Sequence, residues 1–165
     1  MIGLTPLGIV HTAISLIAVA AGIIALVRYR AISLGNLVGQ VYVITTILTC
    51  VTGFGIFKDG RFGIAHVLGV VTLAVLALAA VAGKTRRFGR ASPYVETVSY
   101  SATLFFHMIP AFTETATRFP IDAPLAANDQ APGLQAAIGA CFVVFLFGAA
   151  LNKNTTKHEI GRAHV

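Results

Sequence analysis

The chain has 165 residues, of which 56% are hydrophobic and 11% are charged, and its mean hydropathy is +0.83. Soluble domains carry about 25% charged residues, and a chain of this size cannot bury so much apolar surface in its own core, so the composition excludes an ordinary soluble domain. The net charge of +6 lies in short segments between apolar runs, which excludes the clustered basic face of a nucleic-acid-binding protein. We therefore expect one membrane domain whose main partner is the lipid bilayer.

Five apolar runs are each long enough to cross a bilayer, which takes about 20 helical residues. In chain order they are Leu7–Val27, Leu37–Phe57, Phe62–Ala82, Pro93–Thr115 and Gly133–Leu151. The first run is not expected to be a cleaved secretory signal, because no Lys or Arg precedes it. The fourth run is the most polar, and hydropathy alone would reject it.

The distribution of Lys and Arg sets the orientation, because short cytoplasmic loops are enriched in these residues. With the N-terminus outside, three basic residues are external, Lys58, Arg61 and Arg118. The cytoplasmic basic residues are Arg28, Arg30, Lys84, Arg86, Arg87, Arg90, Lys153 and Lys157. This balance requires the polar fourth span, since without it Lys153 and Lys157 would lie outside. The sequence therefore predicts an all-α, polytopic transmembrane helix bundle of five spans, with its N-terminus outside and its C-terminus cytoplasmic, in a bacterial inner membrane.

We divide the chain into a single transmembrane helical domain at residues 1–152 and a cytoplasmic tail at residues 153–159. The last six residues, 160–165, read Ile-Gly-Arg-Ala-His-Val. The same peptide is encoded by the opening of a common short-read sequencing adapter. We expect these residues to be non-native read-through, and we assign them no functional role.

Three histidines lie inside apolar runs, each in a different predicted span: His11, His66 and His107. An ionisable residue inside a membrane is costly and usually faces the interior of the bundle or a water-filled path. A helix rises about 1.5 Å per residue, and on that scale all three histidines fall in the outer half of the membrane. We therefore treat them as candidate ligands of one site.

Two kinds of cofactor suit such a site. Three neutral imidazoles with an open fourth position are typical of catalytic zinc, and imidazole also suits copper and iron. Alternatively, His11 and His66, at equal depth, would supply the two axial ligands of a single haem b. A two-haem electron path is not expected, because no histidine falls in the inner half of the membrane. The cofactor stays open between a divalent metal (zinc, copper or iron) and one haem b.

One face of the fourth span is polar, with side chains spaced by four, three, four and seven residues. These residues are Glu96, Tyr100, Thr103, His107 and Glu114. The second span carries a similar stripe, which comprises Tyr42, Thr46, Thr49 and Gly53. Polar stripes in membrane helices face protein or water rather than lipid. Around the histidine site, Glu114, Tyr100, Thr103 and Glu96 form the expected supporting polar shell.

The favoured hypothesis is a small integral membrane protein with a histidine-based metal or haem site. Redox chemistry is one activity that such a site could support. The alternative is a protein without a cofactor. In that case the polar stripe passes protons in coupled transport, with several copies of the chain enclosing the path as a homo-oligomer, or it only fixes the register of the helices in a scaffold.

The segment GRFGIAHVLGVVTLAVLALAAVAG and the histidine near the start of both the first and third spans resemble an uncharacterised bacterial family. Its members are small multi-spanning membrane proteins, and the resemblance covers roughly the first four spans. The resemblance implies a bacterial membrane location and does not assign an activity.

Overall fold

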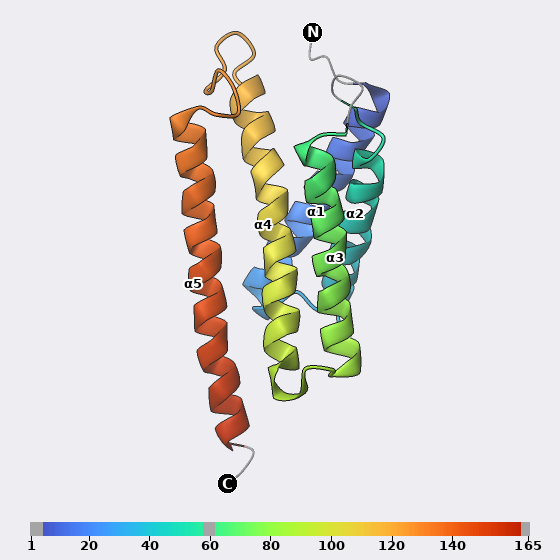
Figure 1. Cartoon of the computed structure of the whole chain (residues 1–165), viewed down its shortest axis with the longest axis vertical. Coiled ribbons are helices and arrows are strands. Elements are labelled where there is room, and N and C mark those ends of the chain that lie inside the picture. The colour runs from blue at the N-terminus through green and yellow to red at the C-terminus, as the bar shows by residue number, and fades with distance from the viewer. Residues whose placement is uncertain (1–4, 58–61, 163–165) are drawn as a thin grey trace. The chain divides into compact units, whose positions relative to one another are not determined.

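The structure, a computed structural model, describes residues 5–57 and 62–162, with side chains described up to Leu151. Five α helices account for most of these residues, and no strand occurs among them (Figure 1). In chain order the elements are α1 (Pro6–Tyr29), α2 (Leu37–Gly53), α3 (Ile64–Thr85), the short 3-10 helix η1 (Gly89–Ala91), α4 (Ser92–Arg118) and α5 (Pro132–Arg162). The all-α class is confirmed, and each helix corresponds to one predicted span.

The boundaries differ from the expected ones chiefly at the C-terminal ends of two helices, of which α5 is longer than expected and α2 is shorter. Helix α2 ends at Gly53 and not at Phe57, because Gly53 and Gly55 flank a turn in which the Gly55 N–H donates to the Thr52 carbonyl at 3.1 Å. At its start, Asn36 accepts a hydrogen bond from the Gly39 N–H at 2.9 Å, which caps the first turn.

Some sequence-based assignments fall at or beyond the edges of the described residues. Helix α5 continues through the predicted tail as far as Arg162, and residues 163–165 of the predicted read-through lie outside the described residues. The predicted outer-loop cations Lys58 and Arg61 also lie outside them.

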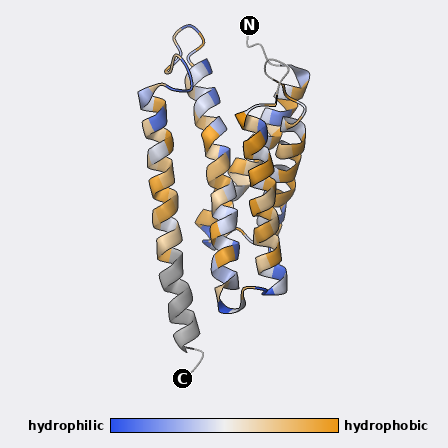
Figure 2. Ribbon diagram, viewed as in Figure 1, coloured by the Kyte–Doolittle hydropathy of each residue, from blue (hydrophilic) through white to orange (hydrophobic). Residues whose placement is uncertain are grey.

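Within the described residues, three helices are long and apolar enough to cross a membrane: α1, α3 and the Pro132–Leu151 part of α5. Helix α2 is apolar but shorter, with 17 residues. Helix α4 is long enough, but its polar stripe makes it too hydrophilic to count as a candidate span. Hydrophobic residues run along these helices, and hydrophilic ones gather at the turns (Figure 2). These properties indicate a membrane protein.

Small residues form the buried face of α1, and large side chains form its exposed face. The buried residues are Gly8, Ala18, Ala21, Gly22 and Ala25. Leu16, Ile23 and Val27 are among the exposed ones. This arrangement is typical of membrane helices, in which small residues permit close helix approach while large apolar side chains face lipid.

The chain consists of two compact units. The first unit is Gly3–Leu104 and the second is Phe105–Val165, so the continuous helix α4 contributes its first half to one unit and its second half to the other. In the first unit, α1 packs against α2 and α2 against α3. In the second unit, Phe105 of α4 stacks near Phe142 and Phe145 of α5, with ring centroids 5.3 and 5.9 Å away.

We predict that Gly39→Ala destabilises the first unit by about 1–3 kcal/mol, because the new Cβ would overlap the Ser33 carbonyl and force the α1–α2 connection to move. The free energy of unfolding is measured by circular dichroism during titration of detergent micelles with dodecyl sulfate. Gly139→Ala is the matched control, since no atom lies within 4 Å of a Cβ at that position. Equal unfolding free energies for the two variants would contradict the close packing at Gly39.

Candidate functional site

The polar faces of α2 and α4 meet inside the first unit. The hydroxyl oxygens of Tyr42 and Thr103 lie 2.8 Å apart, and both side chains are fully buried. Thr46 and Thr49, the next members of the α2 stripe, are also buried. The prediction that these stripes face protein rather than lipid is confirmed for this part of α4.

The hydrogen bonds in this interior have a defined direction. Thr103 donates its single hydroxyl hydrogen to the Tyr100 carbonyl at 2.8 Å, so the Tyr42 phenol is the donor to Thr103. Thr46 in turn hydrogen-bonds the Tyr42 phenol. Since Tyr42 uses its own hydrogen toward Thr103, Thr46 is the donor in that bond. Three hydroxyls thus form one chain that runs from Thr46 through Tyr42 to Thr103.

Tyr100 places a second phenol in the same interior. Its side chain is fully buried, and its hydroxyl has no hydrogen-bond partner among the described residues. A buried hydroxyl without a partner costs about 1–3 kcal/mol, so this position favours a water molecule or a polar atom of a bound solute. Tyr100 belongs to the predicted polar shell and is the member that offers an unused donor.

Glu96 lies one helical turn before Tyr100 and is half-buried. Its carboxylate accepts a hydrogen bond from Ser33 in the α1–α2 connection and interacts electrostatically with Arg86. It also lies against Gly83 of α3, where a Cβ would be 2.6 Å from Oε1. A carboxylate therefore closes the end of the first unit at which α1 ends and α4 begins.

His11 lies toward the opposite end of α2. Its Nδ1 is 3.0 Å from the Thr52 hydroxyl oxygen, and Thr52 donates its own hydrogen to the Leu48 carbonyl at 2.8 Å. Nδ1 is therefore the donor in the bond to Thr52. The imidazole also packs against Gly53, where a Cβ would lie 3.2 Å from Cε1. His11 of α1 thus contacts Thr52 and Gly53, at the C-terminal end of the polar stripe of α2. This contact agrees with the prediction that His11 faces the interior of the bundle.

His66 has a structural role that the sequence reasoning missed. Its Nδ1 accepts a hydrogen bond from the Gly63 N–H at 3.1 Å, and this bond closes the first turn of α3. An imidazole nitrogen that accepts has no hydrogen, so in the neutral ring Nε2 carries it and offers no lone pair to a metal. The signal in the sequence was a potential cap residue followed by a polar residue three positions later, with His in place of the usual Glu or Gln.

Each of the three candidate histidine ligands has its own surroundings in the structure. His11 and His66 make different hydrogen bonds in the first unit, and His107, also buried, belongs to the second. Across the described residues, no group of three or more His, Cys, Asp or Glu is placed to hold a metal ion. The metal and haem assignments gain no support here and stay predictions.

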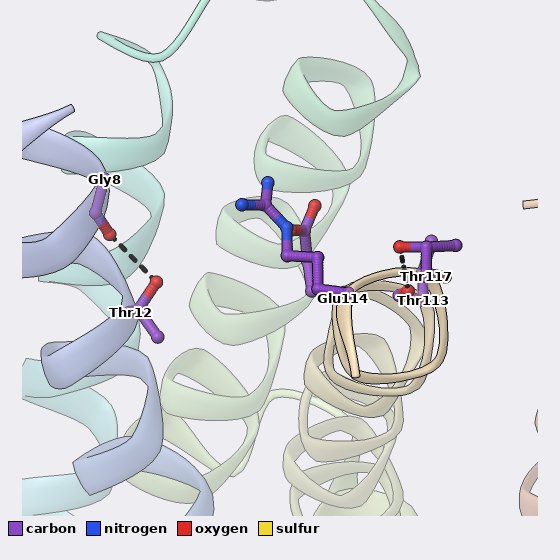
Figure 3. A network of polar contacts seen from close by, with 6 residues as sticks. Gly8, Thr12, Thr113, Glu114 and Thr117 are labelled. Carbon is purple, nitrogen blue, oxygen red and sulfur yellow. Dashed lines mark hydrogen bonds and ion pairs between the residues drawn. The ribbon is translucent and has the colours of Figure 1, made fainter. Parts of the chain in front are cut away.

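Several polar residues of the helices bond groups of their own helix. Thr12 donates to the Gly8 carbonyl on α1, and Thr117 donates to the Thr113 carbonyl on α4 (Figure 3). Glu114 forms an ion pair with Arg118 one turn later on the same helix. A role for Glu114 in the shell of a histidine site stays a prediction.

The contact of Ser33 with Glu96 was not predicted from the sequence. Ser33 lies in a loop, and a loop residue has no periodic pattern that would indicate which way its side chain points.

Comparison with models of known protein families, with curated proteins and with solved structures finds no match to this chain. The resemblance to an uncharacterised bacterial membrane family therefore stays a prediction, and the residues themselves must carry any functional argument.

We predict that Tyr42→Phe and Thr103→Val each destabilise the protein by about 0.6–1 kcal/mol, and that the double variant loses less than the sum. The reason is that both substitutions remove the same interhelical bond. Unfolding titrations of the four proteins in the cycle measure this coupling. Thr45→Val is the control, because the Thr45 hydroxyl donates only to carbonyls of its own helix. Strict additivity would show that the bond contributes nothing.

Proposed function

We propose that this protein moves protons, alone or coupled to a small solute, through the interior of the first unit. The observation that carries the proposal is the buried Tyr100 hydroxyl, an unused donor between the Glu96 carboxylate and the Thr46–Tyr42–Thr103 chain. Ionisable side chains inside a membrane mark proton relays among other functional sites, and Glu96 is such a group at the end of this polar face.

The chemistry of these groups suits proton transfer. Glu96 exchanges protons with the solution at one end, and the His11 imidazole, which can carry a hydrogen on either ring nitrogen, lies toward the other end. Between them, each hydroxyl both donates and accepts, and rotation about its C–O bond re-aims the hydrogen. When Thr103 turns its hydrogen away from the Tyr100 carbonyl, the chain reverses direction. A water molecule on the Tyr100 hydroxyl extends this chain toward Glu96.

The orientation of the chain belongs to the same proposal. Five membrane spans with the N-terminus outside, in a bacterial inner membrane, place Glu96 at the cytoplasmic end and His11 toward the outer end. The basic residues that flank α3 and α4 support this orientation through the positive-inside rule. Protons would then pass between the cytoplasm and the outer face along α2 and the first half of α4.

Proteoliposomes test the proposed activity. With a valinomycin-clamped potassium gradient and an internal pH dye, we expect the wild-type protein to acidify or alkalinise the lumen according to the imposed potential. Glu96→Gln and Tyr100→Phe should lower the rate to near that of empty vesicles, since each removes one exchangeable proton from the path. Tyr29→Phe should keep the wild-type rate, because Tyr29 is an exposed phenol at the end of α1. A wild-type rate equal to that of empty vesicles would refute the proposal.

Cysteine labelling tests the orientation. In a variant with Cys50 and Cys141 replaced by Ala, Asp122→Cys should react with a membrane-impermeant maleimide on intact cells. Arg87→Cys should react only after the membrane is opened. Both positions are exposed, so access of the reagent reports the side of the membrane and not burial. The reverse pattern would place the N-terminus in the cytoplasm.

A further inference from the structure

His66 carries a buried hydrogen-bond donor that no described residue uses. Its side chain is only 4% exposed, and its Nδ1 is occupied by the Gly63 N–H. Nε2 therefore holds the ring hydrogen, and this nitrogen has no partner among the described residues. The helix cap explains the first nitrogen and leaves the second unexplained.

Three phenyl rings surround this imidazole. The centroids of Phe62, Phe57 and Phe54 lie 4.7, 4.9 and 6.5 Å from the imidazole centroid. Their planes are inclined to the imidazole plane by 30, 31 and 12°, so the Phe54 ring is close to parallel with the imidazole and the other two rings are tilted. We call these three phenylalanines and His66 the aromatic cage. Its walls supply apolar carbon and no competing hydrogen-bonding group.

Two rings of the aromatic cage are exposed on the outside of the helices. Phe57 and Phe62 are 55% and 65% exposed, although the imidazole between them is buried. Exposed aromatic rings in a membrane chain face lipid or the membrane–water interface. A ligand in the bilayer can therefore contact the Phe57 and Phe62 rings, and it reaches the buried Nε2 when those rings move aside.

We propose that the aromatic cage binds the carbonyl group of a membrane-soluble amphiphile, with His66 Nε2–H donating to the carbonyl oxygen. The ligand must accept a hydrogen bond, because Nε2 carries the hydrogen. It must also be largely apolar, because the other contacts are phenyl carbons. A quinone ring meets both conditions, and its flat apolar faces suit contact with aromatic rings. The ester carbonyl of a phospholipid offers the same chemistry from a second source.

Calorimetric titration of the protein in detergent with menadione, a short naphthoquinone, tests the quinone source. We expect saturable binding and a lowered quinone carbonyl stretch in the infrared spectrum, as hydrogen bonding weakens that bond. Phe57→Leu and Phe62→Leu should each weaken binding by about tenfold through loss of ring stacking. Phe88→Leu should leave it unchanged, because Phe88 is an exposed ring on the α3–α4 turn.

A matched pair at His66 separates the donor from the helix cap. His66→Gln and His66→Glu both keep a side-chain oxygen that accepts the Gly63 N–H, so both should retain the wild-type unfolding midpoint. Gln keeps a donor, whereas an ionised Glu side chain has none, so in alkaline buffer His66→Gln should retain measurable menadione binding and His66→Glu should lose it. Equal binding by these two variants would overturn the proposal. If His66→Glu fails to fold, the phenylalanine variants still decide it.

The phospholipid source is tested without added quinone. The Nε2–H resonance of histidine labelled with nitrogen-15 is recorded in nanodiscs of ester-linked and of ether-linked phosphatidylcholine, since the ether lipid lacks the carbonyl. A resonance that differs between the two lipids assigns the site to phospholipid. Absence of both menadione binding and a lipid-dependent resonance overturns the proposal. None of these measurements involves proton flux, so the outcome is independent of the Glu96–Tyr100 path.

Discussion

The first unit depends on the requirement that buried hydroxyl groups find partners within the protein. Tyr42 of α2 meets Thr103 of α4, and both are fully buried. In the protein interior, neither hydroxyl has bulk water to bond, so turning either helix about its axis would leave an unpaired donor at a cost of a few kcal/mol. The pairing of α2 with α4 therefore fixes which residues of α4 face the interior, and Tyr100 and Glu96 follow from that choice.

Close approach of the helices makes this pairing possible. A Cβ at Gly22 of α1 would lie 2.8 Å from Leu104 Cδ1 and 3.0 Å from the Tyr42 ring. A larger residue at Gly22 would displace the phenol from Thr103. The same principle applies at Gly83, which leaves room for the Glu96 carboxylate. Small residues thus determine where the polar groups meet, although they contribute no chemistry of their own.

Periodicity in the sequence was enough to predict the helices and the polar faces. The four-three-four spacing from Glu96 to His107 identified one side of α4, and the Tyr42–Thr46–Thr49 spacing identified its counterpart on α2. Convergence of the histidines could not be predicted in the same way. Depth in a membrane fixes one coordinate, whereas a shared site also requires helix rotation and neighbour identity. His66 shows the difference, because its Nδ1 bonds its own helix terminus.

The polarity of α4 has a consequence for how the chain enters a membrane. Helix α4 is not among the segments that are apolar enough to be stable in lipid alone, whereas α1 and α3, which precede it, are. Tyr42 of α2, which bonds Thr103 of α4, is synthesised 61 residues before it. Because synthesis proceeds from the N-terminus, the helices that shelter the polar face are made before that face. In the proposed five-span topology, the order of the helices along the chain is thus also a workable order of membrane insertion.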